Sequence, residues 1–378
     1  MTSSLDTLTI RGFKSIKEVI DFELKELNVI IGGNGAGKSN LISFFRMLRA
    51  LIDGNLSRYV KDNGGAGDIL FNGRKVTATM EFEMRFGSRG FRFKLAPTPG
   101  NALAIEDEAR FYSASGWWLL GDSEDTSSLM VKEVMMKQKD AHYSKPVYDA
   151  ISSWQIYHFH DTSSTAAMRN YEIVQDSKVL RSDAANIAPF LLKLKQKHAK
   201  EYQEILNAIC LVAPFFENFI LEPQESGAKK EVNLSWTQKG SDYPMQPYHL
   251  SDGSIRFICL ATALLQPNPP ATIIIDEPEL GLHPAAIAIL AELIQVAAKQ
   301  TQVIVATQSP ALIDQFGIED IVVVNRENGA STFKRLKEQD FTGSNAQYST
   351  HGLNASNPLF ENTYEIQIQS SALSTQLG

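Results

Sequence analysis

The stretch Gly32-Gly33-Asn34-Gly35-Ala36-Gly37-Lys38-Ser39 decides the fold of this chain. It has the spacing G-x-x-x-x-G-K-S/T, and it lies between an apolar run at residues 27–31 and a stretch of helical periodicity at residues 38–51. A glycine-rich loop between a strand and a helix presents backbone N–H groups, and the positive end of the helix dipole, to an anion. We therefore expect this loop, with Asn40 just beyond it, to bind the phosphates of a nucleotide.

Side chains in two segments predict how the phosphates and a metal are held. The Lys38 ammonium is expected to reach the β- and γ-phosphates of ATP, and the Ser39 hydroxyl to ligate Mg²⁺. A second apolar run, residues 272–275, ends in Asp276 and Glu277. Two acids can also end an ordinary strand, but the upstream loop favours a nucleotide site. There Asp276 would hold Mg²⁺ through water, and Glu277 would polarise the attacking water.

The composition is that of a globular protein. The 378 residues are 43% hydrophobic and 21% charged, which excludes a wholly disordered or collagen-like chain. A net charge of −7 argues against a protein that coats nucleic acid through bulk positive charge, although a local basic groove stays open. Two cysteines, Cys210 and Cys259, are too few for a disulfide framework. Because no export signal and no long apolar run are evident, we expect a cytoplasmic protein without membrane segments.

The order of the predicted elements indicates an α/β fold whose nucleotide-binding core is split in the sequence. Residues 1–50 and 250–340 are expected to form that core. Residues 51–160 are expected to form an antiparallel β subdomain with an irregular part, and residues 161–249 a helical lobe. Residues 341–378 contain neither lysine nor arginine and are rich in uncharged polar residues, so we expect a mobile or partner-dependent tail.

Patterns inside the insertion are of three kinds. Apolar residues alternate over residues 76–95, with a turn at 87–90, which indicates a β-hairpin, whereas residues 100–150 look irregular. Helical spacing dominates residues 186–212. The basic run at 193–200 lies in this helical stretch, and we interpret it as a solvated helix face or, alternatively, as a contact to nucleic acid or a partner.

The segment Leu250-Ser251-Asp252-Gly253-Ser254-Ile255-Arg256-Phe257 precedes another apolar helical stretch. It resembles the signature motif of ABC-type ATPases, in which a serine and backbone N–H groups bind the γ-phosphate held by the other subunit. The resemblance implies that Ser251 and Gly253 contact nucleotide. Asp252 stands where transporters usually have glycine. Ser251 is also a natural helix N-cap, and the two roles are compatible.

Downstream, residues 279–284 occupy the place of the family's D-loop, and residues 303–310 that of its switch strand. Gln308 then stands where transporter-type members carry histidine. The resemblance thus implies an uncharged γ-phosphate sensor at Gln308, and with it slow turnover. His283 has two open interpretations, namely a contact to the opposite subunit and a cap for the following helix.

Two further groups of residues leave alternatives open. His158 and His160 would share one face of a strand, but no third metal ligand of suitable type is evident nearby. The same segment lies in the place of the glutamine loop of ABC-type ATPases, so Gln155 or Asp161 could sense the γ-phosphate or Mg²⁺. The cluster Arg11, Phe13 and Lys14 could border the adenine or pack in a β-turn.

Together with Phe13-Lys14-Ser15, these motifs resemble those of stand-alone bacterial ABC-type ATPases of the AAA_21 kind, related to the overcoming-lysogenisation-defect, RecF and SMC families. The resemblance implies a P-loop NTPase head of α/β class, with an antiparallel β subdomain, a helical insertion and no long coiled coil. It also implies ATP and Mg²⁺ as ligands, and a homodimer with ATP at its interface.

Two functions follow as alternatives from the resemblance. The first is an ATPase that dimerises around ATP, hydrolyses it slowly and regulates a separate effector of nuclease or Toprim type, in anti-phage defence. The second is a RecF- or SMC-like DNA-binding ATPase of DNA repair. A transporter ATPase is disfavoured by the long insertion and Gln308. No nuclease activity of the chain itself is expected, because its paired acids are committed to ATP.

Overall fold

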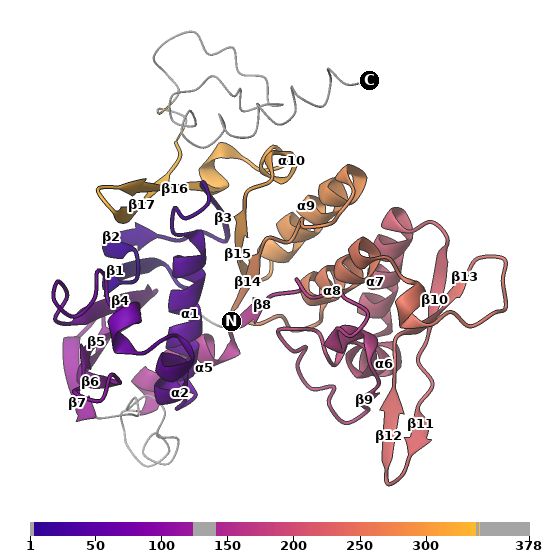
Figure 1. The fold of residues 1–378 in the computed structure, drawn as a ribbon, viewed down its shortest axis with the longest axis horizontal. Coiled ribbons are helices and arrows are strands. Elements are labelled where there is room, and N and C mark those ends of the chain that lie inside the picture. The colour runs from indigo at the N-terminus through magenta and orange to yellow at the C-terminus, as the bar shows by residue number, and fades with distance from the viewer. Residues whose placement is uncertain (1–3, 124–140, 338–339, 341–378) are drawn as a thin grey trace. The chain divides into compact units, whose positions relative to one another are not determined.

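The computed structural model describes residues 4–123, 141–337 and 340, and it divides the chain into two compact units (Figure 1). The first unit contains the chain up to Ser153 and again from Ala306, and the second contains Trp154–Val305. This grouping differs from the expected division at residues 50, 160 and 250. The boundary falls inside strand β15, Gln302–Thr307. The expected tail, 341–378, lies outside the described residues.

A large antiparallel sheet forms one side of the first unit. Its order is β2-β1-β4-β5-β6-β7, and its strands are β1 Thr7–Phe13, β2 Ile16–Glu23, β4 Met80–Phe86, β5 Arg89–Pro97, β6 Leu103–Tyr112 and β7 Gly116–Ser123. On β4, buried and half-buried residues alternate strictly, as expected of a strand with one face in the core. An antiparallel β subdomain is therefore present, as the sequence predicts, and it also includes β1 and β2 from the segment that was expected to belong to the nucleotide-binding core.

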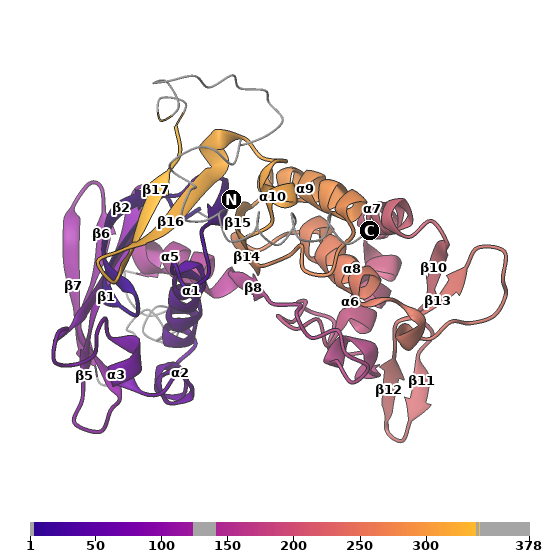
Figure 2. The same ribbon diagram turned by 45° about the horizontal axis from the view of Figure 1, so that its top comes forward.

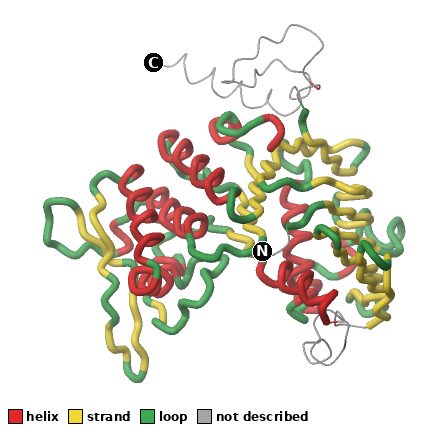
Figure 3. Tube along the Cα trace, turned by 180° about the vertical axis from the view of Figure 1, so that it is seen from behind, coloured by secondary structure: helices red, strands yellow, loops and turns green. Residues whose placement is uncertain are grey.

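Helices cover the inner face of this sheet. They are α1 Lys38–Ile52, α2 Leu56–Asp62, α3 Ala66–Ile69 and α5 Ala141–Ser153 (Figures 1 and 3). On α1, Leu41, Phe44 and Leu48 recur at helical spacing and are buried. The Phe44 ring stacks on the Phe82 ring of β4, with 5.3 Å between ring centroids. An aromatic contact thus joins the helix that follows the phosphate loop to the sheet.

Three further strands of the first unit lie next to the phosphate loop. Strand β3, Leu27–Ile31, leads into the loop and pairs in parallel with β16, Ile321–Glu327, which in turn pairs with β17, Ala330–Arg335. Short helices α10, Pro310–Ile313, and η4, Ile318–Asp320, connect β15 to β16.

The second unit consists of packed helices and three small groups of strands. Its helices are α6 Ile187–Lys197, α7 Ala199–Val212, α8 Asp252–Leu265 and α9 Pro284–Ala298, with short turns η2 Ala167–Arg169 and η3 Pro247–His249. Strand β14, Thr272–Asp276, lies between β8, Gln155–Tyr157, and β15. β10 Phe216–Ile220 pairs with β13 Ser235–Gln238, and β11 Gln224–Ser226 with β12 Lys229–Val232, which pairs with β9 Glu172–Ile173. The β11–β12 hairpin extends away from the helices (Figure 2).

The lengths of the helices test the prediction that the chain has no long coiled coil. The longest described helices, α1 and α9, have 15 residues each. The described part of the chain therefore contains no long coiled coil, as the sequence predicts.

Three sequence expectations need correction. The alternating strand begins at Met80 and not at Val76, because the Val76 and Thr77 N–H groups bond to the Gly73 carbonyl in a turn. Residues 100–150 are less irregular than expected, since they contain β6, β7 and α5. Helical spacing over 186–212 belongs to two helices, because His198 ends α6 and starts α7 with φ −140°.

We expect Phe82→Ala to lower the free energy of unfolding of the first unit by about 3–5 kcal/mol, because the ring is 2% exposed and contacts three other phenylalanine rings. Urea titration followed by circular dichroism measures the change. Val76→Ala is the matched control. Val76 is 64% exposed, so its removal should change stability by no more than about 0.5 kcal/mol. Equal losses in both variants would contradict the assignment of the core.

Candidate nucleotide site

The phosphate loop of the first unit can be built only with glycine at two of its positions. Gly32 has φ 156° and Gly37 has φ 122°. A side chain at Gly32 would collide with the carbonyl oxygen of Val324, and one at Gly37 would collide with the Ser331 side chain. Their backbones therefore lie directly against the β16–β17 hairpin, which fixes the shape of the loop.

Lys38 lies within this loop. It is 6% exposed, and its ammonium donates to the carbonyl oxygens of Gly32 at 2.5 Å and Gly33 at 3.3 Å. Ser39 is exposed on the first turn of α1. That turn has no acidic residue and no side-chain cap, so the positive helix end keeps its attraction for an anion. These features fit a triphosphate, with Ser39 available to a metal.

A chain of hydrogen bonds connects the phosphate loop and the start of α1 to the β1–β2 turn and to β17. Asn40 donates its side-chain amide to Ser15 Oγ at 2.6 Å, and Ser15 Oγ lies 2.6 Å from Ser331 Oγ. Ser331 in turn donates to the carbonyl oxygen of Ala36 at 2.5 Å. Asn40, expected to contact nucleotide, thus has an observed positioning contact, and its contact with nucleotide stays a prediction. Ser331 has no sequence signal, because it is one serine on a distant strand.

The cluster at the start of the chain packs around a turn. Phe13 is fully buried, and Arg11 pairs with Glu18 at 2.8 Å. Lys14 has φ 47° and donates to Ser43 Oγ at 2.6 Å. Burial lowers the pKa of the Lys14 ammonium, with a smaller contribution from Arg46. The turn-packing interpretation is therefore what these contacts show.

In the second unit, Ser251 directly precedes helix α8. Its Oγ accepts the Ser254 N–H at 3.1 Å, so the predicted N-cap is confirmed. Ser251 is nevertheless exposed, and it stands at the positive end of a 14-residue helix. At Gly253 a Cβ would lie 2.6 Å from the carbonyl oxygen of Gly281. Glycine at this position therefore lets the first turn of α8 pack against the 279–283 loop.

The two acids after the apolar run lie at the end of β14. Residues 272–275 are buried, while Asp276 and Glu277 are half-buried. Glu277 has φ 45°, an unfavourable backbone conformation for a side chain of this size and one that is common at functional sites. The strand therefore delivers both carboxylates to its carboxyl edge, as the sequence predicts.

Residues after β8 share this edge. β8 pairs in parallel with β14, with Tyr157 opposite Ile275 and Gln155 opposite Ile273. Gln155 is therefore two residues away from the strand end, whereas His160 is at the edge, where its Nε2 lies 3.0 Å from the Asp276 carbonyl oxygen. Asp161 accepts hydrogen bonds from the Ser163 hydroxyl and N–H, and these bonds lower the pKa of its carboxyl.

The His158 and His160 rings lie with centroids 3.9 Å apart. Among the described residues, no group of three or more His, Cys, Asp or Glu is placed to hold a metal. His283 caps α9, because its Nδ1 accepts the Ala285 N–H at 3.3 Å, so the capping role is observed and contact with another subunit stays a prediction. Gln308 follows β15 in the first unit and is half-buried; its sensor role also stays a prediction.

Arg256, one turn into α8, lies within the signature-like segment, but the sequence indicates no role for it. Its Nε donates to the Phe159 carbonyl at 2.8 Å and its Nη2 to the His160 carbonyl at 3.0 Å, while Nη1 contacts the Leu280 carbonyl. Burial lowers the pKa of this guanidinium, and Asp252 partly opposes that effect. Arg256 therefore joins α8 to the segment after β8 and to the 279–283 loop.

Comparison with solved structures agrees with this architecture. The chain is similar to an SMC head bound to the C-terminal winged-helix domain of ScpA, with TM-score 0.58, 16% identity, and coverage of 89% of this chain and 99% of that chain. It is also similar to an SMC head with an extended coiled coil, bound to the C-terminal domain of ScpA, from Pyrococcus furiosus, with TM-score 0.51, 16% identity, and coverage of 89% and 97%. At this identity the likeness establishes the fold, that of an ABC-type ATPase head.

The remaining findings concern sequence relatives, membrane segments and the family. No curated protein matches the sequence. Among the described helices, none combines the length and the hydrophobicity that a membrane span requires. The model of the AAA_21 family, described as "AAA domain, putative AbiEii toxin, Type IV TA system", matches residues 27–314, which include the phosphate loop, the signature-like segment and the paired acids. Because this match spans well over half of the chain, the protein belongs to the AAA_21 family of ATPases.

Proposed function

We propose that this protein binds ATP with Mg²⁺, dimerises around it and hydrolyses it slowly. The observation that carries the proposal is the phosphate loop, whose glycine backbone, uncapped α1 N-terminus and Lys38 ammonium suit a triphosphate. Mg²⁺, when bound, would neutralise phosphate charge, and Ser39 and Asp276 are its proposed ligands.

Glu277 is the proposed general base, because a carboxylate at the end of β14 can accept a proton from water. Its left-handed backbone conformation supports a functional role for this position. Gln308 is the proposed sensor of the γ-phosphate. An amide carries no charge and cannot supply a proton as histidinium can, which is the basis for expecting slow hydrolysis.

We propose Ser251 and Gly253 as the contacts to ATP held by a second copy of the chain. Support comes from the exposed Ser251 hydroxyl and from the α8 N-terminus beside it. In this proposal the ATP-bound homodimer regulates a separate effector protein of nuclease or Toprim type in anti-phage defence, within the cytoplasm. The relationship to the overcoming-lysogenisation-defect and RecF families belongs to the same proposal.

A second candidate is a RecF- or SMC-like DNA-binding ATPase in DNA repair. It is favoured by three exposed lysines at the junction of α6 and α7, namely Lys195, Lys197 and Lys200. Lys193 from the same basic run is engaged differently, because its ammonium donates to the carbonyl oxygens of Ser177 and Lys178.

We expect Lys38→Ala to reduce ATP hydrolysis by about a hundredfold or more, because it removes the cation closest to the phosphates. Steady-state phosphate release with purified protein measures the effect. Lys17→Ala, which removes an exposed lysine of the same unit, is the control and should keep the parent rate. Hydrolysis at the parent rate by the Lys38→Ala protein would show that the loop assignment is wrong.

We expect Glu277→Gln to keep ATP binding but to slow hydrolysis by about a hundredfold, so that an ATP-bound dimer accumulates. Light scattering at micromolar protein concentration measures the mass with and without ATP. Adding Ser251→Arg should abolish the dimer, because a bulky cation then occupies the α8 N-terminus. Gln203→Arg, on the exposed surface of α7, is the matched control. A Glu277→Gln protein that stays monomeric with ATP refutes the sandwich.

The DNA-binding alternative predicts a different result. If it holds, Lys195→Glu with Lys197→Glu should weaken duplex binding and reduce the slope of log K against log salt by about one per lost phosphate contact. Fluorescence anisotropy with labelled duplex at several salt concentrations measures this slope. Under the regulatory proposal, ATP-dependent dimerisation of the same double variant stays at the parent level. If the parent protein does not bind duplex DNA, this result argues against the repair function.

A further inference from the structure

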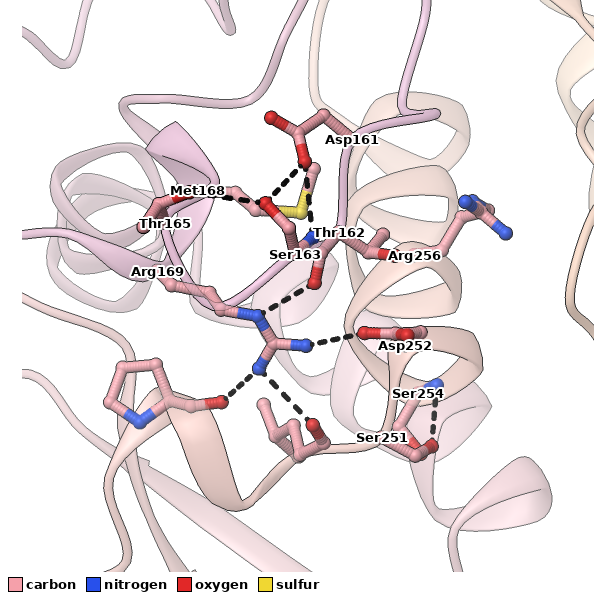
Figure 4. Close-up of polar contacts among 12 residues, drawn as sticks. Asp161, Thr162, Ser163, Thr165, Met168, Arg169, Ser251, Asp252, Ser254 and Arg256 are labelled. Carbon is pink, nitrogen blue, oxygen red and sulfur yellow. Dashed lines mark hydrogen bonds and ion pairs between the residues drawn. The ribbon is translucent and has the colours of Figure 1, made fainter.

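Arg169 is a buried arginine for which the sequence gives no role. It ends the short turn η2, and its side chain is 5% exposed. Its guanidinium makes four polar contacts within the second unit (Figure 4): Nε donates to the Thr162 carbonyl at 3.0 Å, Nη1 to the carbonyls of Pro247 at 2.6 Å and Leu250 at 3.1 Å, and Nη2 to Asp252 Oδ1 at 2.9 Å.

Three of the four acceptors lie on Pro247, Leu250 and Asp252, close to Ser251, the N-cap residue of α8. Pro247 opens the turn η3, Leu250 directly precedes Ser251, and Asp252 directly follows it. One planar guanidinium thereby holds both sides of Ser251. A lysine could not replace it. The donors of an ammonium all lie on one nitrogen, whereas the planar guanidinium spreads its donors over three nitrogens and so reaches acceptors in several directions.

Asp252 poses an electrostatic problem at this position. A carboxylate on the first turn stabilises a helix, but it repels a phosphate that approaches the same helix end. The Asp252 side chain is 68% exposed, so burial does not remove it from the approach. Its ion pair with Arg169 supplies the compensating charge next to Ser251.

Independent contacts hold the segment that carries Arg169. Met168, the preceding residue, lies with its sulfur 3.9 Å from Cys259 Sγ on α8, and both residues are buried. The loop before η2 is closed by Asp161, which accepts the Ser163 N–H and hydroxyl (Figure 4). Removing the guanidinium should therefore leave η2 attached to α8.

We propose that Arg169 is a positioning residue for the phosphate contact of Ser251, which it secures by holding residues 247–252 in shape and by neutralising Asp252. The proposal rests on the proposed function, in which Ser251 meets the γ-phosphate of ATP bound to a second copy. It assigns to Arg169 a role in assembly of the ATP dimer and none in binding ATP to the monomer.

The test uses the full-length Glu277→Gln protein as parent, with ATP-dependent dimerisation measured by light scattering across protein concentrations. Arg169→Met should weaken the dimer by about tenfold or more, because several charge-assisted hydrogen bonds are lost together. Fluorescent ADP binding to the monomer should change by less than about twofold, since the phosphate loop is unaltered. Arg169→Lys should recover only part of the loss. Arg181→Met, an exposed ion-paired arginine of the same unit, is the control and should dimerise like the parent.

A further variant tests whether Arg169 neutralises Asp252. Adding Asp252→Gly to Arg169→Met should recover part of the lost dimer, because no unpaired carboxylate then faces the phosphate. Misfolding would not be repaired in this way, so the rescue separates positioning from general stability. If Arg169→Met fails to fold, Arg169→Lys carries the same test, and parent-level dimerisation by that variant overturns the proposal.

Three outcomes are decisive. Dimerisation of the folded Arg169→Met protein at the parent level overturns the positioning role and leaves the proposed function intact. Absence of any rescue by Asp252→Gly overturns the neutralisation of Asp252. If the Glu277→Gln parent does not dimerise with ATP, the proposed function fails, and the positioning role fails with it.

Discussion

The close approach of the phosphate-loop backbone to the β16–β17 hairpin is the constraint on which the first unit depends. Gly32 and Gly37 leave no room for a Cβ against Val324 and Ser331. The β16–β17 hairpin therefore shapes a loop that is almost 300 positions earlier in the chain. Ser15, from the β1–β2 turn, completes the support through its contacts with Ser331 and Asn40. Two distant segments are thus needed before the loop can present its N–H groups.

Buried guanidinium groups have a comparable task in the second unit. Arg169 and Arg256 both donate mainly to main-chain carbonyls, and together they join the segment after β8, the start of α8 and the 279–283 loop. A buried charge needs such partners, because an unpaired cation in the interior is costly. The same bonds fix the backbone of Ser251 relative to that of His160, whose ring contacts the Asp276 carbonyl.

Local patterns predicted the parts of the fold that local forces determine. The phosphate loop, strand β14 and the Ser251 cap each follow from neighbouring residues, so the sequence was sufficient for them. Arg169 and Ser331 could not be found in this way, because most of their partners lie roughly 80 to 300 positions away. β6 and β7 were missed for a different reason. Phe111 and Trp117 face outward under the Arg85 guanidinium, which blurs the alternation of buried and exposed residues.

Lys38 and Arg169 show how similar contacts serve different purposes. The Lys38 ammonium donates to two carbonyls of a loop built for phosphate, and a compact cation on a flexible stem can redistribute its donors when an anion arrives. Arg169 donates in fixed directions to carbonyls on two segments and to Asp252, and its planar group cannot turn to a ligand without losing several bonds at once. The lysine is therefore suited to bind the substrate, whereas the arginine is suited to hold the protein in the form that binds it.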